Sequence, residues 1–108
     1  MAFIDLNTQP SREIAPGFHG KFIHTDNISI AHWDIRKGAS IPLHDHVHEM
    51  VVNVVAGELE LTVGGEVKVL KPGMCATIPG HVPHKATAIT DCQVIDVFYP
   101  VREDYKSL

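Results

Sequence analysis

The sequence contains no apolar run long enough to cross a membrane as a helix. Such a helix needs about 20 consecutive, mostly apolar residues, and the 108 residues hold no run of that kind. The first 30 residues also lack the basic start, the long apolar stretch and the small-residue cleavage site of a secretory signal. We therefore expect a soluble, cytoplasmic protein without a membrane partner.

Positive charge is also scarce. The chain carries nine Lys and Arg residues against 13 Asp and Glu residues, and its formal net charge is −4. A nucleic-acid-binding surface requires clustered Lys and Arg side chains, and this sequence has no basic cluster. These counts predict that the partner is a small molecule rather than a nucleic acid.

Cysteine is limited to Cys75 and Cys92, which lie on separate segments outside any CxxC pattern. A disulfide framework or a zinc site usually shows cysteines at closer or repeated spacings. We therefore predict two buried thiols without a functional role.

Helical periodicity is missing as well, and short alternating segments take its place. After a loose opening over residues 1–20, apolar and polar residues alternate in segments separated by turn residues. Gly64-Gly65 predicts a two-residue hairpin turn, because glycine adopts positive φ at little steric cost. A single domain over 1–108 with about nine or ten short strands must curl or form two packed sheets to protect its edges. We predict an all-β fold, a small antiparallel barrel or jelly roll.

His44 and His46 are the first candidate ligands of a metal ion. Residues two apart on a strand project to the same face, so their imidazoles can bind one ion at about 2.0–2.1 Å. His84 is the best candidate for a third ligand, because it stands where a proline-stiffened turn meets the next strand. The residues alone leave open whether the pair binds a metal or is simply solvated. His81 is expected to be exposed within its turn, and His48 and Glu49 are expected on the bend after the pair, in either a turn role or a functional one. The remaining histidines are expected to be structural or exposed: His19, His24 and His32.

The spacing around these histidines resembles the first cupin motif over residues 38–57. In that motif a glycine precedes the His-x-His pair, and a Glu or Gln and a second glycine follow it. The corresponding residues here are Gly38, His44, His46, Met50 and Gly57. A thioether is a weak ligand for a hard divalent ion. The expected inner sphere is therefore the three histidines, with Glu49 as a fourth ligand only if a bulge turned the strand.

Residues 73–88 resemble the second cupin motif. Gly73, Pro79 and His84 match it, whereas His81 and Ala88 stand where the motif has Gly and Asn. Together the two motifs imply a double-stranded β-helix (jelly-roll) barrel, usually a homodimer, with one divalent metal ion held by the three histidines. Such donors accept zinc, nickel, iron, manganese and copper.

The C-terminal stretch DVFYPVREDY, residues 96–105, is similar to the ending of KdgF-type cupins. Two earlier stretches resemble the same group, so the resemblance extends over nearly the whole chain. That group converts 4,5-unsaturated uronates from pectin or alginate to open-chain 5-keto-4-deoxyuronates. The resemblance implies that Asp96, Phe98 and Arg102 are catalytic and that the substrate is a small anionic sugar. The planar fork of an arginine matches the carboxylate that a uronate carries.

Three alternatives accompany this hypothesis. Without the resemblance, the C-terminal stretch would be interpreted as a strand end with an exposed Asp–Arg pair of little energetic value. A three-histidine cupin site also suits an iron-dependent dioxygenase that acts on a small molecule. Met50, in place of the usual ligand, suits a non-enzymatic sugar- or anion-binding cupin. The favoured hypothesis is a metal-dependent enzyme of uronate catabolism.

Overall fold

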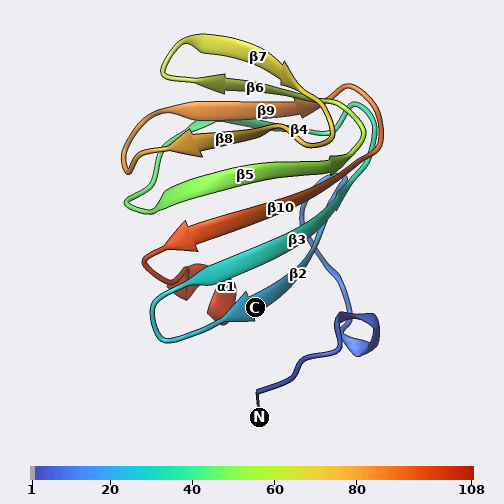
Figure 1. Ribbon diagram of the computed structural model, residues 1–108, viewed down its shortest axis with the longest axis vertical. Coiled ribbons are helices and arrows are strands. Elements are labelled where there is room, and N and C mark those ends of the chain that lie inside the picture. The colour runs from blue at the N-terminus through green and yellow to red at the C-terminus, as the bar shows by residue number, and fades with distance from the viewer. Residues whose placement is uncertain (1) are drawn as a thin grey trace.

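The computed structural model describes residues 2–108, and strands dominate them (Figure 1). Ten strands are joined by short turns, and the helices are a 3-10 turn, η1 (Leu6–Thr8), and a single α-helical turn, α1 (Glu103–Lys106). The strands are β1 (Arg12–Ala15), β2 (Phe18–His24), β3 (Ser29–Ile35), β4 (Ser40–His44), β5 (Glu49–Ala56), β6 (Leu59–Val63), β7 (Glu66–Leu70), β8 (Cys75–Ile78), β9 (His84–Ala88) and β10 (Cys92–Tyr99). None of the helices in this part of the chain is long and apolar enough to span a membrane.

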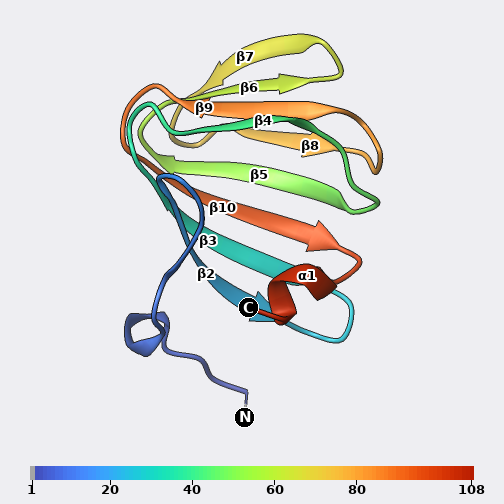
Figure 2. The same cartoon turned by 180° about the vertical axis from the view of Figure 1, so that it is seen from behind.

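The strands form two antiparallel sheets. The larger sheet has six strands in the order β1-β2-β3-β10-β5-β8, and the smaller has four in the order β4-β9-β6-β7. Figures 1 and 2 show the two sheets from opposite sides, with the chain crossing repeatedly between them. The predicted all-β architecture of two packed sheets is confirmed.

The core lies between the two sheets because alternate residues of each strand point inward. On β3 the buried residues include Ala31, Trp33 and Ile35, and on the smaller sheet Leu59 and Leu61 face them. Burial of a large apolar side chain contributes about 1.5–3 kcal/mol. This alternation also fixes the register, since a slip by one residue would turn every apolar side chain to solvent.

The hairpin predicted at Gly64-Gly65 is confirmed. Both glycines have positive φ, +56° and +88°, and Val63 pairs directly with Glu66 across the turn. The β6–β7 hairpin closes the outer edge of the smaller sheet.

The expected loose opening over residues 1–20 differs from the structure. Residues 12–15 form β1, and β2 begins at Phe18. Gly17, with φ +82°, allows the chain to reverse within a tight turn, so that Ala15 pairs with Phe18. Pro16 and Gly17 therefore mark a hairpin turn in an edge pair, where a proline is tolerated because no ladder hydrogen bond is lost.

The C-terminal segment folds back onto the larger sheet. After β10 the chain passes Pro100 and forms α1, which lies beside β2 (Figure 2). Tyr105 on α1 contacts the rings of Phe22, Trp33 and Phe98, with ring centroids 4.8–6.2 Å apart. This turn of helix thus places an aromatic side chain against the inner face of the sheet.

Candidate metal centre and active site

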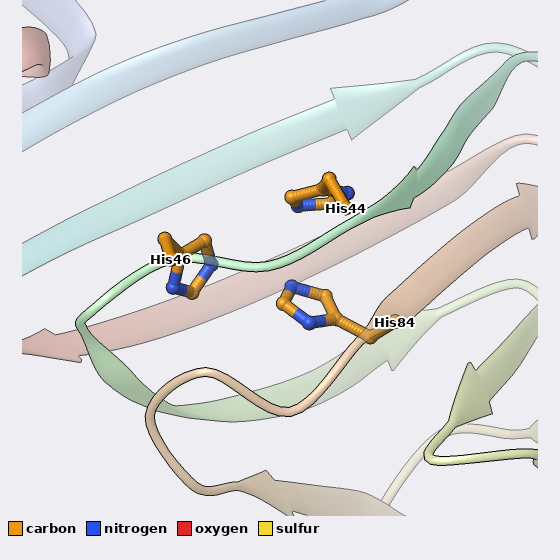
Figure 3. Close-up of side chains that lie close together, drawn as sticks. All are labelled: His44, His46 and His84. Carbon is orange, nitrogen blue, oxygen red and sulfur yellow. The ribbon is translucent and has the colours of Figure 1, made fainter.

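Three histidines converge at one end of the space between the sheets. His44 ends β4, His46 lies in the bend that follows, and His84 begins β9, directly opposite His44 in the strand register. One ring nitrogen from each lies within 4.8 Å of those from the other two. Figure 3 shows the three rings facing a common centre. The sequence-predicted trio is therefore brought together by two neighbouring strands and one bend.

The backbone holds the three rings in the orientation that metal binding requires. The Nδ1 atom of His44 lies 2.8 Å from the Pro42 carbonyl oxygen, that of His46 lies 2.9 Å from the His48 carbonyl oxygen, and that of His84 lies 2.8 Å from the Val82 carbonyl oxygen. A carbonyl oxygen only accepts, so each Nδ1–H donates. Each Nε2 is left with a free lone pair, which is the usual arrangement of histidine ligands.

Burial favours the neutral form of the His46 and His84 imidazoles. Desolvation, helped by the positive charge of Arg102, lowers the pKa of His46 to about 4. Burial also lowers the pKa of His84, which is only 5% exposed. Neutral imidazole nitrogens are borderline donors that suit divalent transition metals. The donor set therefore fits the metal ion that the cupin motifs imply.

A second loop fixes the bend that carries His46. The His81 backbone N–H donates to the His46 carbonyl oxygen at 2.7 Å. A Cβ atom on Gly80 would lie 2.5 Å from the Val47 carbonyl oxygen, so the two loops approach too closely for any larger residue. His81 itself is exposed, as predicted, and has φ +66°. That left-handed conformation explains why the second cupin motif has glycine at this position.

The histidines form one wall of a cavity of about 120 Å³. All three catalytic candidates also line it: Asp96 and Phe98, which share the inner face of β10, and Arg102 from the segment before α1. Most of the other residues that line the cavity are apolar. Metal-binding nitrogens, a carboxyl group and a guanidinium group thus meet in one small, largely apolar space, which is typical of small-molecule sites.

Asp96 is the unusual group in this cavity. Its Oδ2 accepts a hydrogen bond from Trp33 Nε1–H at 3.0 Å, while its enclosed Oδ1 lacks a hydrogen-bond partner among the described residues. Burial raises the pKa of Asp96 to about 7, although the Trp33 hydrogen bond and the charge of Arg102 act in the opposite direction. A carboxyl group with a pKa near 7 is well suited to exchanging protons at neutral pH.

The raised pKa of Asp96 predicts a stability that depends on pH. Between its ordinary pKa of 3.8 and about 7 the folded state keeps a proton that the unfolded chain releases, so stability falls as pH rises. At 1.36 kcal/mol per pKa unit, the free energy of unfolding should fall by about 4 kcal/mol across this pH range because of Asp96. We expect the metal-free Asp96→Asn variant to gain stability over the parent at pH 8, and to gain less at pH 5. Urea unfolding of both proteins at each pH measures this difference. A difference between variant and parent that is the same at both pH values would contradict this.

Arg102 is held more firmly than an exposed arginine. Its Nε–H and Nη2–H donate to the two carboxylate oxygens of Asp104 at 2.9 and 2.7 Å. The guanidinium carbon lies 4.0 Å from the ring centroid of Tyr105 and 4.8 Å from that of Phe98. The side chain is only 11% exposed. The structure thus differs from the alternative of an exposed Asp–Arg surface pair.

Met50 and Glu49 lie on opposite faces of β5. Met50 is buried and lines the cavity, whereas Glu49 is exposed and pairs in regular register with Tyr99. No bulge turns Glu49 inward, so the structure leaves it outside the cavity. His48 lies in the bend before β5, as expected, with its ring near those of His46 and Phe98.

Two expectations about other side chains have different outcomes. Cys92 is buried as predicted, but the prediction for Cys75 is wrong because it is exposed. Cys75 faces outward on β8 because its neighbours Met74 and Ala76 take the inward positions. Three further histidines, His19, His24 and His32, do not line the cavity.

Three residues at the site were missed in the sequence: Trp33, Asp104 and Tyr105. Trp33 lies on β3, next to β10, and only strand pairing reveals that its N–H meets Asp96. Asp104 and Tyr105 follow Arg102 directly. An acidic residue two positions after a candidate binding arginine, followed by an aromatic residue, was the available signal.

Comparison with known proteins agrees with this architecture. Residues 31–98 match the family described as "Cupin domain", and the chain belongs to the cupin family. It is 31% identical over 106 residues to the pectin degradation protein KdgF of Dickeya dadantii (strain 3937), an alignment that covers 95% of this chain and 96% of that protein.

Two solved structures are similar over almost the full length. KdgF from Halomonas sp. superposes with a TM-score of 0.92 at 30% identity, covering 97% of this chain and 98% of that one. An RmlC-like cupin from Shewanella frigidimarina NCIMB 400 gives a TM-score of 0.92 at 31% identity, covering 97% and 96%. The resemblance to KdgF-type cupins is therefore confirmed.

Proposed function

We propose that this protein is a metal-dependent cupin enzyme of pectin degradation that converts a cyclic 4,5-unsaturated uronate to the open-chain 5-keto-4-deoxyuronate. The observation that carries the proposal is the content of the cavity. Three histidines whose ring nitrogens lie within 4.8 Å of one another share a cavity of about 120 Å³ with Asp96 and Arg102. The likeness to proteins named KdgF supports the choice of substrate class.

His44, His46 and His84 would hold one divalent ion. When bound, that ion supplies Lewis-acid polarisation of substrate oxygens. The reaction itself is an isomerisation. A proton leaves the anomeric hydroxyl, the bond between C1 and the ring oxygen breaks, and C4 gains a proton as the C5 enol becomes a ketone. No oxidant is needed.

The remaining residues bind the sugar and move the proton. Arg102 binds the uronate carboxylate, because its fork offers parallel N–H donors. Phe98 forms a flat apolar wall for the sugar ring. Asp96 transfers the proton, since its enclosed carboxyl group has an unpartnered oxygen and a pKa of about 7.

A single assay tests this proposal. The purified protein is analysed for bound metal and mixed with an unsaturated monouronate while the ultraviolet absorbance of the conjugated double bond is followed. We expect about one metal ion per chain, loss of the absorbance, and no loss after treatment with a chelator. The proposal would be overturned if the absorbance stayed unchanged with every one of the five candidate metals.

Met50 favours a second candidate, a non-enzymatic sugar- or anion-binding cupin. It occupies an inward position of β5, lines the same cavity as the histidines and offers only a thioether. Tight uronate binding without conversion would select this candidate. Oxygen consumption by an iron-loaded protein would instead select a dioxygenase.

The proposal includes a cytoplasmic location and a homodimer, and the homodimer is what the likeness to cupins implies. Light scattering on the eluting protein measures the mass directly, and a monomer of 11.9 kDa would contradict the dimer.

A further inference from the structure

Asp104 occupies only one edge of the Arg102 guanidinium group. The Nε–H and one Nη2–H bind the two carboxylate oxygens side-on at 2.9 and 2.7 Å. An arginine has five N–H donors in a planar fork. Asp104 therefore does not use the end-on edge, which is formed by Nη1 and the second N–H of Nη2. Asp104 can hold the arginine without taking the place of a substrate.

The aromatic rings restrict the remaining freedom of this group. The guanidinium carbon lies over Tyr105 at 4.0 Å and over Phe98 at 4.8 Å, which limits tilting of its plane. The two bonds to Asp104 prevent rotation within that plane. The backbone of Arg102 is also held in place, because its N–H donates to the buried Ser29 Oγ at 2.7 Å.

Asp96 is the competing partner for Arg102. Both side chains line the same cavity, and the charge of Arg102 already acts on the Asp96 carboxyl group. The enclosed Oδ1 of Asp96 has no hydrogen-bond partner among residues 2–108. An arginine released from Asp104 would gain most by moving toward this oxygen, since charge-assisted hydrogen bonds are strongest in enclosed sites.

We propose that Asp104 is a positioning residue that anchors Arg102 side-on and so prevents it from pairing with Asp96. Asp96 then keeps its proton for transfer, and Arg102 keeps its end-on edge for the substrate carboxylate. The catalytic meaning of this arrangement rests on the function proposed above. The effect of Asp104 on Asp96 is a property of the protein alone and is measured without substrate.

Several charged or titratable groups share the cavity with Asp96, and the test must separate their influence from that of Asp104. They come from the bend and β4, from β9 and from the C-terminal segment: His44, His46, His84, Lys85, Arg102 and Tyr105. Trp33, on the adjacent strand, contributes an uncharged donor.

The experiment is a carboxyl carbon NMR titration of the full-length, metal-free chain labelled in aspartate. The Asp96 resonance is identified by its loss in Asp96→Asn. We expect Asp104→Asn to lower the pKa of Asp96 by about one unit or more, because a close opposite charge lowers a carboxyl pKa by ~1–3 units. Glu103→Gln is the matched control, since it makes the same charge change one residue away, where the Glu103 carboxylate forms an ion pair with Lys106 at 3.9 Å.

A second background shows whether the effect passes through Arg102. In Arg102→Met protein, the further change Asp104→Asn should leave the pKa of Asp96 unchanged. An unchanged pKa in Asp104→Asn alone, an equal shift in Glu103→Gln, or a shift that persists without Arg102 would each overturn the proposal. A clear NMR shift in a protein that does not convert uronate would instead contradict only the proposed function.

Discussion

Replacement of Asp96 by asparagine is expected to lower kcat for the unsaturated uronate by ~10²–10⁴-fold, the range that general acid–base catalysis contributes. The substitution preserves the shape of the side chain, and an amide oxygen can still accept the Trp33 N–H. It removes only the exchangeable carboxyl proton. Because binding contacts remain, KM should change much less than kcat.

Steady-state kinetics with the metal-loaded variant measure this effect. Asp34→Asn is the matched control, because Asp34 lies on the outer, exposed face of β3 and outside the cavity. The parent enzyme should also show a limb in its pH–rate profile that is missing from the profile of Asp96→Asn. Equal kcat values for Asp96→Asn and the parent would remove Asp96 from the reaction.

Replacement of His84 by alanine is expected to reduce metal affinity by more than ~100-fold. Loss of a residue that only hydrogen-bonds to a metal ligand already lowers metal affinity by ~10–100-fold. His84 is buried, and its ring lies 4.3 Å from that of His44 and 4.8 Å from that of His46, between centroids. Its removal leaves only two donors, His44 at a strand end and His46 in the bend that follows. Competition with a chromophoric chelator measures the affinity.

His81→Asn provides the control for that measurement. His81 is exposed, lies three residues before His84 and has a left-handed backbone that asparagine tolerates. Its metal affinity should match that of the parent. If His84→Ala retained full affinity while circular dichroism showed a native fold, the three-histidine site would be wrong.

The His-x-His pair was predictable because its two residues are neighbours in the sequence, and His84 was predictable from its proline-stiffened turn and its match to the second cupin motif. The His-x-His pair lies at a strand end, and the turn of Pro79 and Pro83 brings His84 to the neighbouring strand. Likewise, the alternation on β10 places Asp96 and Phe98 on one face. The β10 pattern follows from the two-residue period of a strand, whereas His46 reaches the site from the bend after β4.

Features that depend on pairing between distant segments were not predictable. The strand β1 consists of only four residues, and its hairpin partner begins after Pro16-Gly17, which is also typical of a loop. The single turn α1 is too short to show helical periodicity. Its docking beside Phe22 and Trp33 comes from tertiary packing, so the contacts of Asp104 and Tyr105 emerged only from the structure.

The candidate site draws its groups from both layers of the fold. The histidines at positions 44 and 84 belong to strands β4 and β9 of the smaller sheet, whereas Asp96 and Phe98 belong to β10 of the larger one. Strands β9 and β10 share no backbone ladder. A uronate held at both walls would act as a non-covalent cross-link between the layers. Its binding free energy would therefore stabilise the packing of the two sheets against each other. The stability of this packing would rise with the fraction of cavities that hold a uronate.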